Sequence, residues 1–221
     1  ANMCNEAALA AARDNMKAVS MSHFEYAADR VIAGLEKKSK VVNKTERRTV
    51  AYHEAGHAII GVLMKDYDTV RKVSILPRGQ TAGVTYFQPL PEDIGVYTKE
   101  YLLSRIKVAL GGHAAEEIVY GKDKVTTGAS NDFEQTYRIA REMIITYGMS
   151  DTIGKININP ELMSSHMSKC VDNEIRSITD SCYYEVMHLL RKYRTELDAL
   201  KNILVYKEII DGSVVYDIIK K

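Results

Sequence analysis

Apolar residues recur every third or fourth position over most of this sequence, which predicts a mainly helical protein. The first such stretch, residues 5–34, has an alanine-rich run and then an amphipathic segment in which Ser22, followed by Glu25, predicts a helix N-terminal cap. Gly34 is typical of a residue just past a helix end. The pattern therefore predicts a small helical unit up to this glycine.

A lysine-rich segment, residues 36–44, interrupts the apolar pattern and predicts a solvated linker. We place a domain boundary near residue 38, which divides the chain into residues 1–38 and 39–221. The next helix is predicted from about Thr45 onward. Residues three or four positions apart share one side of this helix, and they are Val50, His53, Glu54, His57, Ile60, Gly61 and Met64.

Two shorter stretches have the pattern of β-strands. Residues 70–76 alternate in polarity and are rich in β-branched side chains, and residues 83–88 have a similar composition. Turn-forming residues, Pro77 to Gly79, lie between them. These features predict a small antiparallel sheet with at least one open edge.

Helical spacing returns in three later stretches, residues 98–120, 133–147 and 167 to the end. Thr98 is the predicted cap of the first, and Gly121 and Gly148 are predicted to end the first and second. The fold class predicted is therefore mainly α with a small antiparallel β-sheet.

A pair of glycines, Gly111 and Gly112, interrupts the helix predicted over residues 98–120. Each costs about 1 kcal/mol of helix stability relative to alanine. A glycine pair inside a helix indicates close packing of another element, because the missing side chains let a neighbour approach.

Composition narrows the classes of function. The 221 residues are 46% hydrophobic, and 30 Lys and Arg against 29 Asp and Glu leave a net charge of +1, which gives no reason to expect nucleic-acid binding. The longest apolar run, residues 58–64, is far shorter than the roughly 20 residues that span a bilayer. Cys4, Cys170 and Cys182 form no CxxC pair, which argues against a disulfide framework or a thiolate zinc site.

The strongest chemical signal is an HExxH pattern, formed by His53, Glu54 and His57 on a predicted helix. One helical turn separates the two imidazoles, so both can bind one zinc ion from the same side. Glu54 would then lie beside the metal as the general base of a hydrolytic reaction.

Hydrolytic zinc sites usually have a third protein ligand. The HExxHxxGxxH continuation is excluded, since Ile60 and Leu63 occupy its glycine and third histidine positions. The ligand must come from another part of the chain, and Glu116, Glu117 and Asp132 are all candidates. Spacing alone does not rank them.

Four blocks in order resemble the FtsH family of AAA zinc metalloproteases: residues 49–57 (TVAYHEAGH), 72–83 (KVSILPRGQTAG), 110–121 (LGGHAAEEIVYG) and 127–132 (TGASND). The resemblance implies a zinc metalloendopeptidase domain over residues 39–221. It also implies that Asp132, which ends the fourth block, is the third zinc ligand beside His53 and His57. Glu116 matches an acidic neighbour that would orient a ligating imidazole.

The resemblance also carries expectations about the whole protein. Residues 1–38 look like the end of the helical lid of an AAA ATPase module, while no GxxxxGK[ST] loop is present, so ATP and Mg²⁺ would bind only in a missing ATPase portion. The family implies a homo-hexamer that degrades unfolded or misassembled proteins, membrane proteins among them. A membrane anchor is expected upstream, in a mitochondrial or plastid inner membrane or else a bacterial one.

Two other functional hypotheses compete with that of a protease. One is a non-catalytic module that assembles a hexamer, although a scaffold has no use for a general base at Glu54. The other is a deformylase-type enzyme, which would need a cysteine ligand in a glycine-rich context. Cys4 lies far from His53 and has no such context. The protease is therefore the function we predict from the sequence, with the assembly module as its alternative.

Overall fold

The computed structural model describes residues 2–37, 43–65, 67–79, 81–89 and 95–220. Within them the main elements are α1 (Asn2–Arg13), α2 (Met21–Ala33), α3 (Lys44–Leu63), β1 (Thr69–Ser74), β2 (Val84–Gln88), α4 (Lys99–Tyr120), α5 (Ser130–Ile145), α6 (Ser165–Lys192), α7 (Arg194–Lys207), β3 (Ile209–Asp211) and α8 (Gly212–Ile219). The predicted fold class, mainly helical with a small antiparallel sheet, is confirmed. None of the helices in these ranges is long and apolar enough to cross a membrane.

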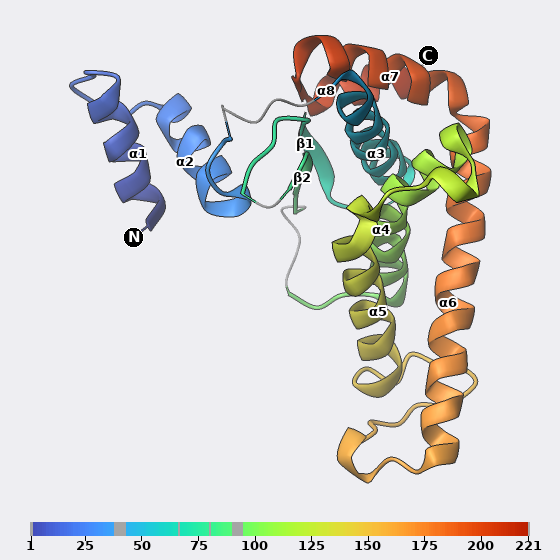
Figure 1. The fold of residues 1–221 in the computed structure, drawn as a ribbon. Helices are drawn as coiled ribbons and strands as arrows, with labels where there is room; N and C mark the ends of the chain where they lie inside the picture. The colour runs from blue at the N-terminus through green and yellow to red at the C-terminus, as the bar shows by residue number, and fades with distance from the viewer. Residues whose placement is uncertain (1, 38–42, 66, 80, 90–94, 221) are drawn as a thin grey trace.

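The helices lie on two sides of the small sheet (Figure 1). The pair α1–α2 stands apart on one side, next to the loop between β1 and β2, and the remaining helices form the larger body on the other side. There, α3 and α4 pack together, the long α6 runs beside α4 and α5, and α7 covers α3. The fully buried side chains of this body include Tyr52, Ile59, Ile106, Ile144 and Leu197.

The sheet has three strands in the order β2-β1-β3, and both pairings are antiparallel. Val73 in the central strand pairs with Thr85 on one side and with Ile210 on the other. The predicted pair of strands is therefore present, with a third strand added from the C-terminal part of the chain. Strand β2 is an edge strand of this sheet, and no other strand of the described residues pairs with its outer side.

The C-terminal third is mainly helical, as the apolar spacing predicts, and it is divided into α6, α7 and α8, with β3 before the last helix. Tyr193 is the C-cap of α6, and Glu208 is the C-cap of α7, where a φ of +63° turns the chain into β3. The Glu208 carbonyl then accepts a hydrogen bond from Ile75 N at 2.9 Å, which helps attach this turn to the sheet. Neither turn contains a glycine or proline, so the sequence gives no local signal for these two breaks.

The predicted helix ends have mixed outcomes. Thr98 caps α4 by accepting from Tyr101 N at 3.1 Å, and Gly121 ends this helix at a φ of +86°. The cap of α2 is centred on Ser20, whose N–H donates to His23 Nδ1 at 2.9 Å, so the prediction of Ser22 was wrong. The predicted domain boundary near residue 38 lies outside the described residues.

Candidate metal centre

The two histidines of the HExxH pattern lie one turn apart on α3 and face the same point. This helix begins where Asn43 Oδ1 accepts from Glu46 N at 2.7 Å, and the pattern occupies its buried second half. His53 Nε2 and His57 Nε2 are 3.0 Å apart. A helical spacing of four thus places two imidazole nitrogens together, as the sequence predicts.

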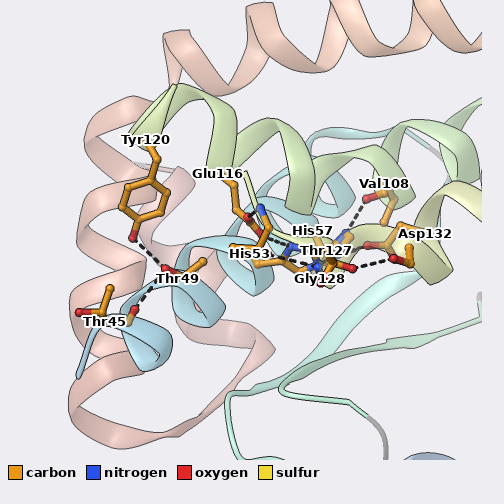
Figure 2. A network of polar contacts seen from close by, with 12 residues as sticks. Thr45, Thr49, His53, His57, Val108, Glu116, Tyr120, Thr127, Gly128 and Asp132 are labelled. Atoms are coloured by element: carbon orange, nitrogen blue, oxygen red, sulfur yellow. Dashed lines mark hydrogen bonds and ion pairs between the residues drawn. The ribbon is translucent and has the colours of Figure 1, made fainter. Parts of the chain in front are cut away.

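Asp132 reaches the same point from the first turn of α5 (Figure 2). Its Oδ2 lies 3.2 Å from His53 Nε2 and 3.5 Å from His57 Nε2. Tetrahedral zinc with bonds of about 2.0–2.1 Å holds its ligand atoms about 3.3 Å apart. The three separations observed between His53, His57 and Asp132 therefore fit one zinc ion without rearrangement of the backbone.

The outer nitrogen of each imidazole has its own hydrogen-bond partner (Figure 2). His53 Nδ1 lies 2.8 Å from Oε1 of Glu116, and His57 Nδ1 lies 2.7 Å from the carbonyl oxygen of Val108. A carbonyl only accepts, so His57 Nδ1 donates, and the tautomer with its hydrogen on Nδ1 carries the lone pair on Nε2. Helix α4 thereby orients both rings with Nε2 available for a metal.

Glu116 is almost completely buried, at 1% exposed, and both of its oxygens have partners. While Oε1 faces His53, Oε2 accepts from Thr126 N at 2.8 Å. Thr126 precedes the short turn that leads into α5 and Asp132. Glu116 therefore joins the histidine helix to the segment that delivers the third carboxylate.

The remaining candidate from the sequence, Glu117, points elsewhere. Its carboxylate accepts a hydrogen bond from the Tyr183 hydroxyl on α6. It is absent from the cavity that the two histidines, Glu116 and Asp132 line. The structure thus places Asp132 against both imidazoles, Glu116 behind one of them, and Glu117 outside the cluster.

The close approach of α3 and α4 depends on glycines. A Cβ atom built on Gly111 would lie 2.8 Å from the Gly56 carbonyl oxygen, and one on Gly112 would lie 2.5 Å from Nε2 of His53 and 2.6 Å from Nε2 of His57. Ordinary Cβ contacts are never this short. The glycine pair in α4 therefore has the close packing that the sequence predicts, and Gly112 leaves the space beside the imidazoles free.

Charges in the cluster favour a cation. Burial alone would lower the pKa of His53, but its hydrogen bonds with Asp132 and Glu116 raise that pKa to about 10. Burial would raise the pKa of the Asp132 carboxyl, but contacts with His53 and His57 hold it well below its ordinary value. Two carboxylates thus surround imidazoles that are largely shielded from solvent, and a metal cation would meet the same electrostatic preference.

Glu54 lies beside the histidines and is 5% exposed. Burial raises the pKa of its carboxyl above the ordinary value, although the His57 and His53 charges and a hydrogen bond from Thr85 lower it. A Cβ on Gly83 would lie 2.8 Å from Glu54 Cγ and Oε1, so this side chain also packs directly against the segment before β2. A carboxylate with an increased proton affinity is suited to accept a proton.

A cavity of about 640 Å³ opens over this cluster. Strand β2 contributes Val84, Thr85 and Phe87 to its wall, and the segment before α5 contributes the opposite side with Thr126 to Gly128. The edge strand and the candidate metal ligands therefore share one cavity. Sequence reasoning had no signal for the contacts of Glu54 with Thr85 or for the Val108 carbonyl, because both depend on tertiary packing.

A comparison with protein families finds that the sequence model of Peptidase family M41 matches residues 40–218. Among curated relatives, an "ATP-dependent zinc metalloprotease FtsH" of Synechococcus sp. is 40% identical over 99% of this chain and 36% of its own length. A chloroplastic FTSH 1 of rice is 44% identical over 96% of this chain, and an FtsH of Rhodothermus marinus is 45% identical over 95%. The chain spans about a third of the length of these relatives, 33% of the rice protein and 31% of the Rhodothermus one.

Proposed function

The chain belongs to peptidase family M41, and we propose that it is a zinc-dependent endopeptidase domain that cleaves peptide bonds within protein chains. The observation that carries the proposal is the convergence of His53, His57 and Asp132, whose ligand atoms all lie within 4.8 Å of one another. Curated relatives are named zinc metalloproteases, which supports zinc as the metal.

His53, His57 and Asp132 would hold the zinc ion, and Glu116 and the Val108 carbonyl would orient the two imidazoles. When bound, zinc supplies a Lewis acid that polarises a carbonyl and lowers the pKa of a water molecule. Three protein ligands leave a fourth position open, as hydrolytic sites require.

Glu54 is the proposed general base. Its carboxylate takes a proton from the attacking water and returns it to the amine leaving group as the peptide bond breaks. The raised pKa of the buried carboxyl favours the first transfer, and the protonated carboxyl is still a strong enough acid to give its proton to an amine. The wall of the cavity beside Glu54 is strand β2, one side of which is not paired with any strand in the described part of the chain. An extended substrate could add there as a further strand and present its carbonyl to the site.

The alternative function, a non-catalytic assembly module, has less support. A scaffold does not need a carboxylate that is 5% exposed beside two histidines, since burying a charge costs free energy. Glu54 is held in that position by contacts from β2 and lines the same cavity as the candidate ligands. This arrangement favours catalysis.

The wider activity of the protein is part of the proposal. The printed names of the relatives include ATP dependence, and some of those relatives are chloroplastic. We therefore infer that an ATPase module works with this domain, that residues 1–38 are the end of its helical lid, and that residues 39–221 are the protease. The match of the family model from residue 40 supports this division. A homo-hexamer, an anchor in an organellar or bacterial inner membrane, and unfolded or membrane-protein substrates complete the proposal.

The decisive experiment replaces Glu54 with Gln. We expect Glu54→Gln to bind zinc as the unchanged chain does, while cleavage of a fluorogenic peptide falls by about 10²- to 10⁴-fold, the usual contribution of general acid-base catalysis. Zinc content is measured in the same samples by atomic absorption. Glu117→Gln makes the same chemical change outside the cavity and should retain activity. Full turnover by Glu54→Gln at full zinc occupancy would contradict the proposal.

A further inference from the structure

Strand β2 holds the carboxylate of Glu54 directly. Thr85 Oγ1 donates to Glu54 Oε2 at 2.7 Å, and the same hydroxyl oxygen lies 3.3 Å from the Glu54 carbonyl oxygen. A hydroxyl has one proton to donate, and the bond to the carboxylate is the stronger because its acceptor is charged. Among the hydrogen bonds of the described residues, Thr85 is the side chain that donates to this carboxylate.

Alternation along β2 explains why Thr85 points toward the site. Successive side chains of a strand face opposite sides, so Thr85 and Phe87 share a side and Tyr86 has the other. The ring of Phe87 packs on α3, where a Cβ on Gly61 would lie 2.4 Å from it. The ring of Tyr86 lies under the Lys72 ammonium, 4.7 Å away. The register of the strand therefore fixes the Thr85 hydroxyl against the HExxH helix.

A general base acts efficiently only when its carboxylate is held in one orientation. A glutamate side chain has several rotatable bonds, and Glu54 has its partner on a different element from its own helix. We propose that Thr85 is a positioning residue, whose hydroxyl fixes Oε2 of Glu54 so that the other oxygen is oriented for proton transfer. This inference rests on the proposed function, since it assumes that Glu54 is the base.

The position of Thr85 on an edge strand extends this role. The side chain of Thr85 reaches Glu54, while β2 pairs with β1 on one side and, among the strands that the structure describes, has no partner on the other. A substrate strand added to the unpaired side would be aligned by the same backbone that positions the base. Loss of the Thr85 hydroxyl should therefore slow turnover and leave substrate pairing intact.

The test compares Thr85→Val, which keeps the shape and removes the donor, with Thr85→Ser, which keeps the donor. We expect kcat for a fluorogenic peptide to fall about 10- to 100-fold in Thr85→Val, the range for one hydrogen bond to a charged group, with KM and zinc content unchanged. Thr85→Ser should recover most of kcat. A merely structural role would move stability and would not produce this split.

Thr69→Val is the matched control, because Thr69 lies on β1 of the same sheet and its hydroxyl donates to the Gln88 carbonyl oxygen at 3.3 Å. It should have the kcat of the unchanged chain. An unchanged kcat in Thr85→Val, or an equal loss in Thr69→Val, would overturn the inference. Failure of the proposed function gives a different result, namely no cleavage by the unchanged chain or cleavage that Glu54→Gln retains.

A second readout does not depend on cleavage. Crystal structures of the unchanged chain and of Thr85→Val would show whether the Glu54 carboxylate keeps its place. We expect it to adopt another rotamer or to lose defined density in the variant, and to keep its place in Thr85→Ser. An identical Glu54 position in all three would contradict the positioning role even if peptide cleavage were too slow to measure.

Discussion

The candidate metal centre and the junction between α2 and the sheet both consist of charged side chains, yet they differ in burial and geometry. In the metal centre, Glu116 and His57 are almost completely buried, and each makes a hydrogen bond shorter than 2.9 Å. At the junction, Lys72 pairs with a partly exposed Asp29 and the Arg71–Glu25 pair is more than half exposed, while Arg78 is the buried exception. The two regions therefore respond to different perturbations.

Backbone contacts add to the junction. Lys37 N donates to the Pro77 carbonyl at 2.9 Å, and Gly79 N donates to the Leu35 carbonyl at 3.0 Å. These bonds connect the segment after α2 with the loop between β1 and β2. The loop ends at Gly83, which packs on Glu54. Attachment of α1–α2 thus rests on hydrogen bonds and ion pairs, whereas the metal centre requires charges that would be costly without a cation.

The largest effect is expected from Asp132→Ala. Removal of one of three proposed ligands should reduce zinc affinity by more than about 100-fold, since even outer-shell partners of metal ligands contribute 10- to 100-fold. Competition with a chromophoric chelator measures the affinity. The fold should remain, because Asp132 lies in the first turn of α5 and is partly exposed.

Glu134→Ala is the matched control, because Glu134 is an exposed acidic residue on the same helix. Its zinc affinity should equal that of the unchanged chain. Tight zinc binding by Asp132→Ala would show that the third ligand lies elsewhere and would remove the difference between the two charged regions.

The sequence predicts this difference only in part. The spacing of His53 and His57 along one helix places both imidazoles on one side, because the geometry is local. The position of the third carboxylate depends on tertiary contacts. Spacing alone does not rank Glu116, Glu117 and Asp132, and the family resemblance is what favours Asp132. The turn at Glu208 illustrates the same limit in the fold, since a positive φ at a non-glycine residue has no local signal.

A smaller effect, on zinc affinity and not on stability, is expected from Gly112→Ala. The added Cβ would lie about as close as 2.5 Å to the imidazole nitrogens, but these are the far ends of side chains that can rotate away. Alanine also favours a helix by about 1 kcal/mol over glycine. Thermal stability of the metal-free protein should therefore change little, because the rings can move. Zinc affinity should fall about 10- to 100-fold, because holding the rings in the metal-binding position against the added Cβ costs a strain of about 1–3 kcal/mol.

Gly128→Ala is the control for this change. A Cβ there would meet Thr126 Oγ1 at 3.2 Å and would not reach the imidazoles, so zinc affinity should be retained. Calorimetry with and without zinc separates the two effects. Equal loss of stability with and without the metal in Gly112→Ala would show that the glycine serves helix packing alone, as Gly111 does against Gly56.

The smallest effect is expected at the junction, from Arg78→Met. The Arg78 side chain is 5% exposed and lies 3.5 Å from Glu36 and 3.6 Å from Asp29, so methionine keeps its volume and removes the charge. Opening of α1–α2 should become more favourable by about 1.5–2 kcal/mol, the lower part of the range for hydrogen bonds to charged groups. Arg71→Ala removes an exposed ion pair and should change the free energy of this opening by less than about 1 kcal/mol.

Hydrogen exchange of the α1 and α2 amides measures the opening in both variants, and zinc affinity should be unchanged in each. Equal protection in Arg78→Met and the unchanged chain at low salt would mean that the backbone bonds to Pro77 and Leu35 suffice to attach this unit.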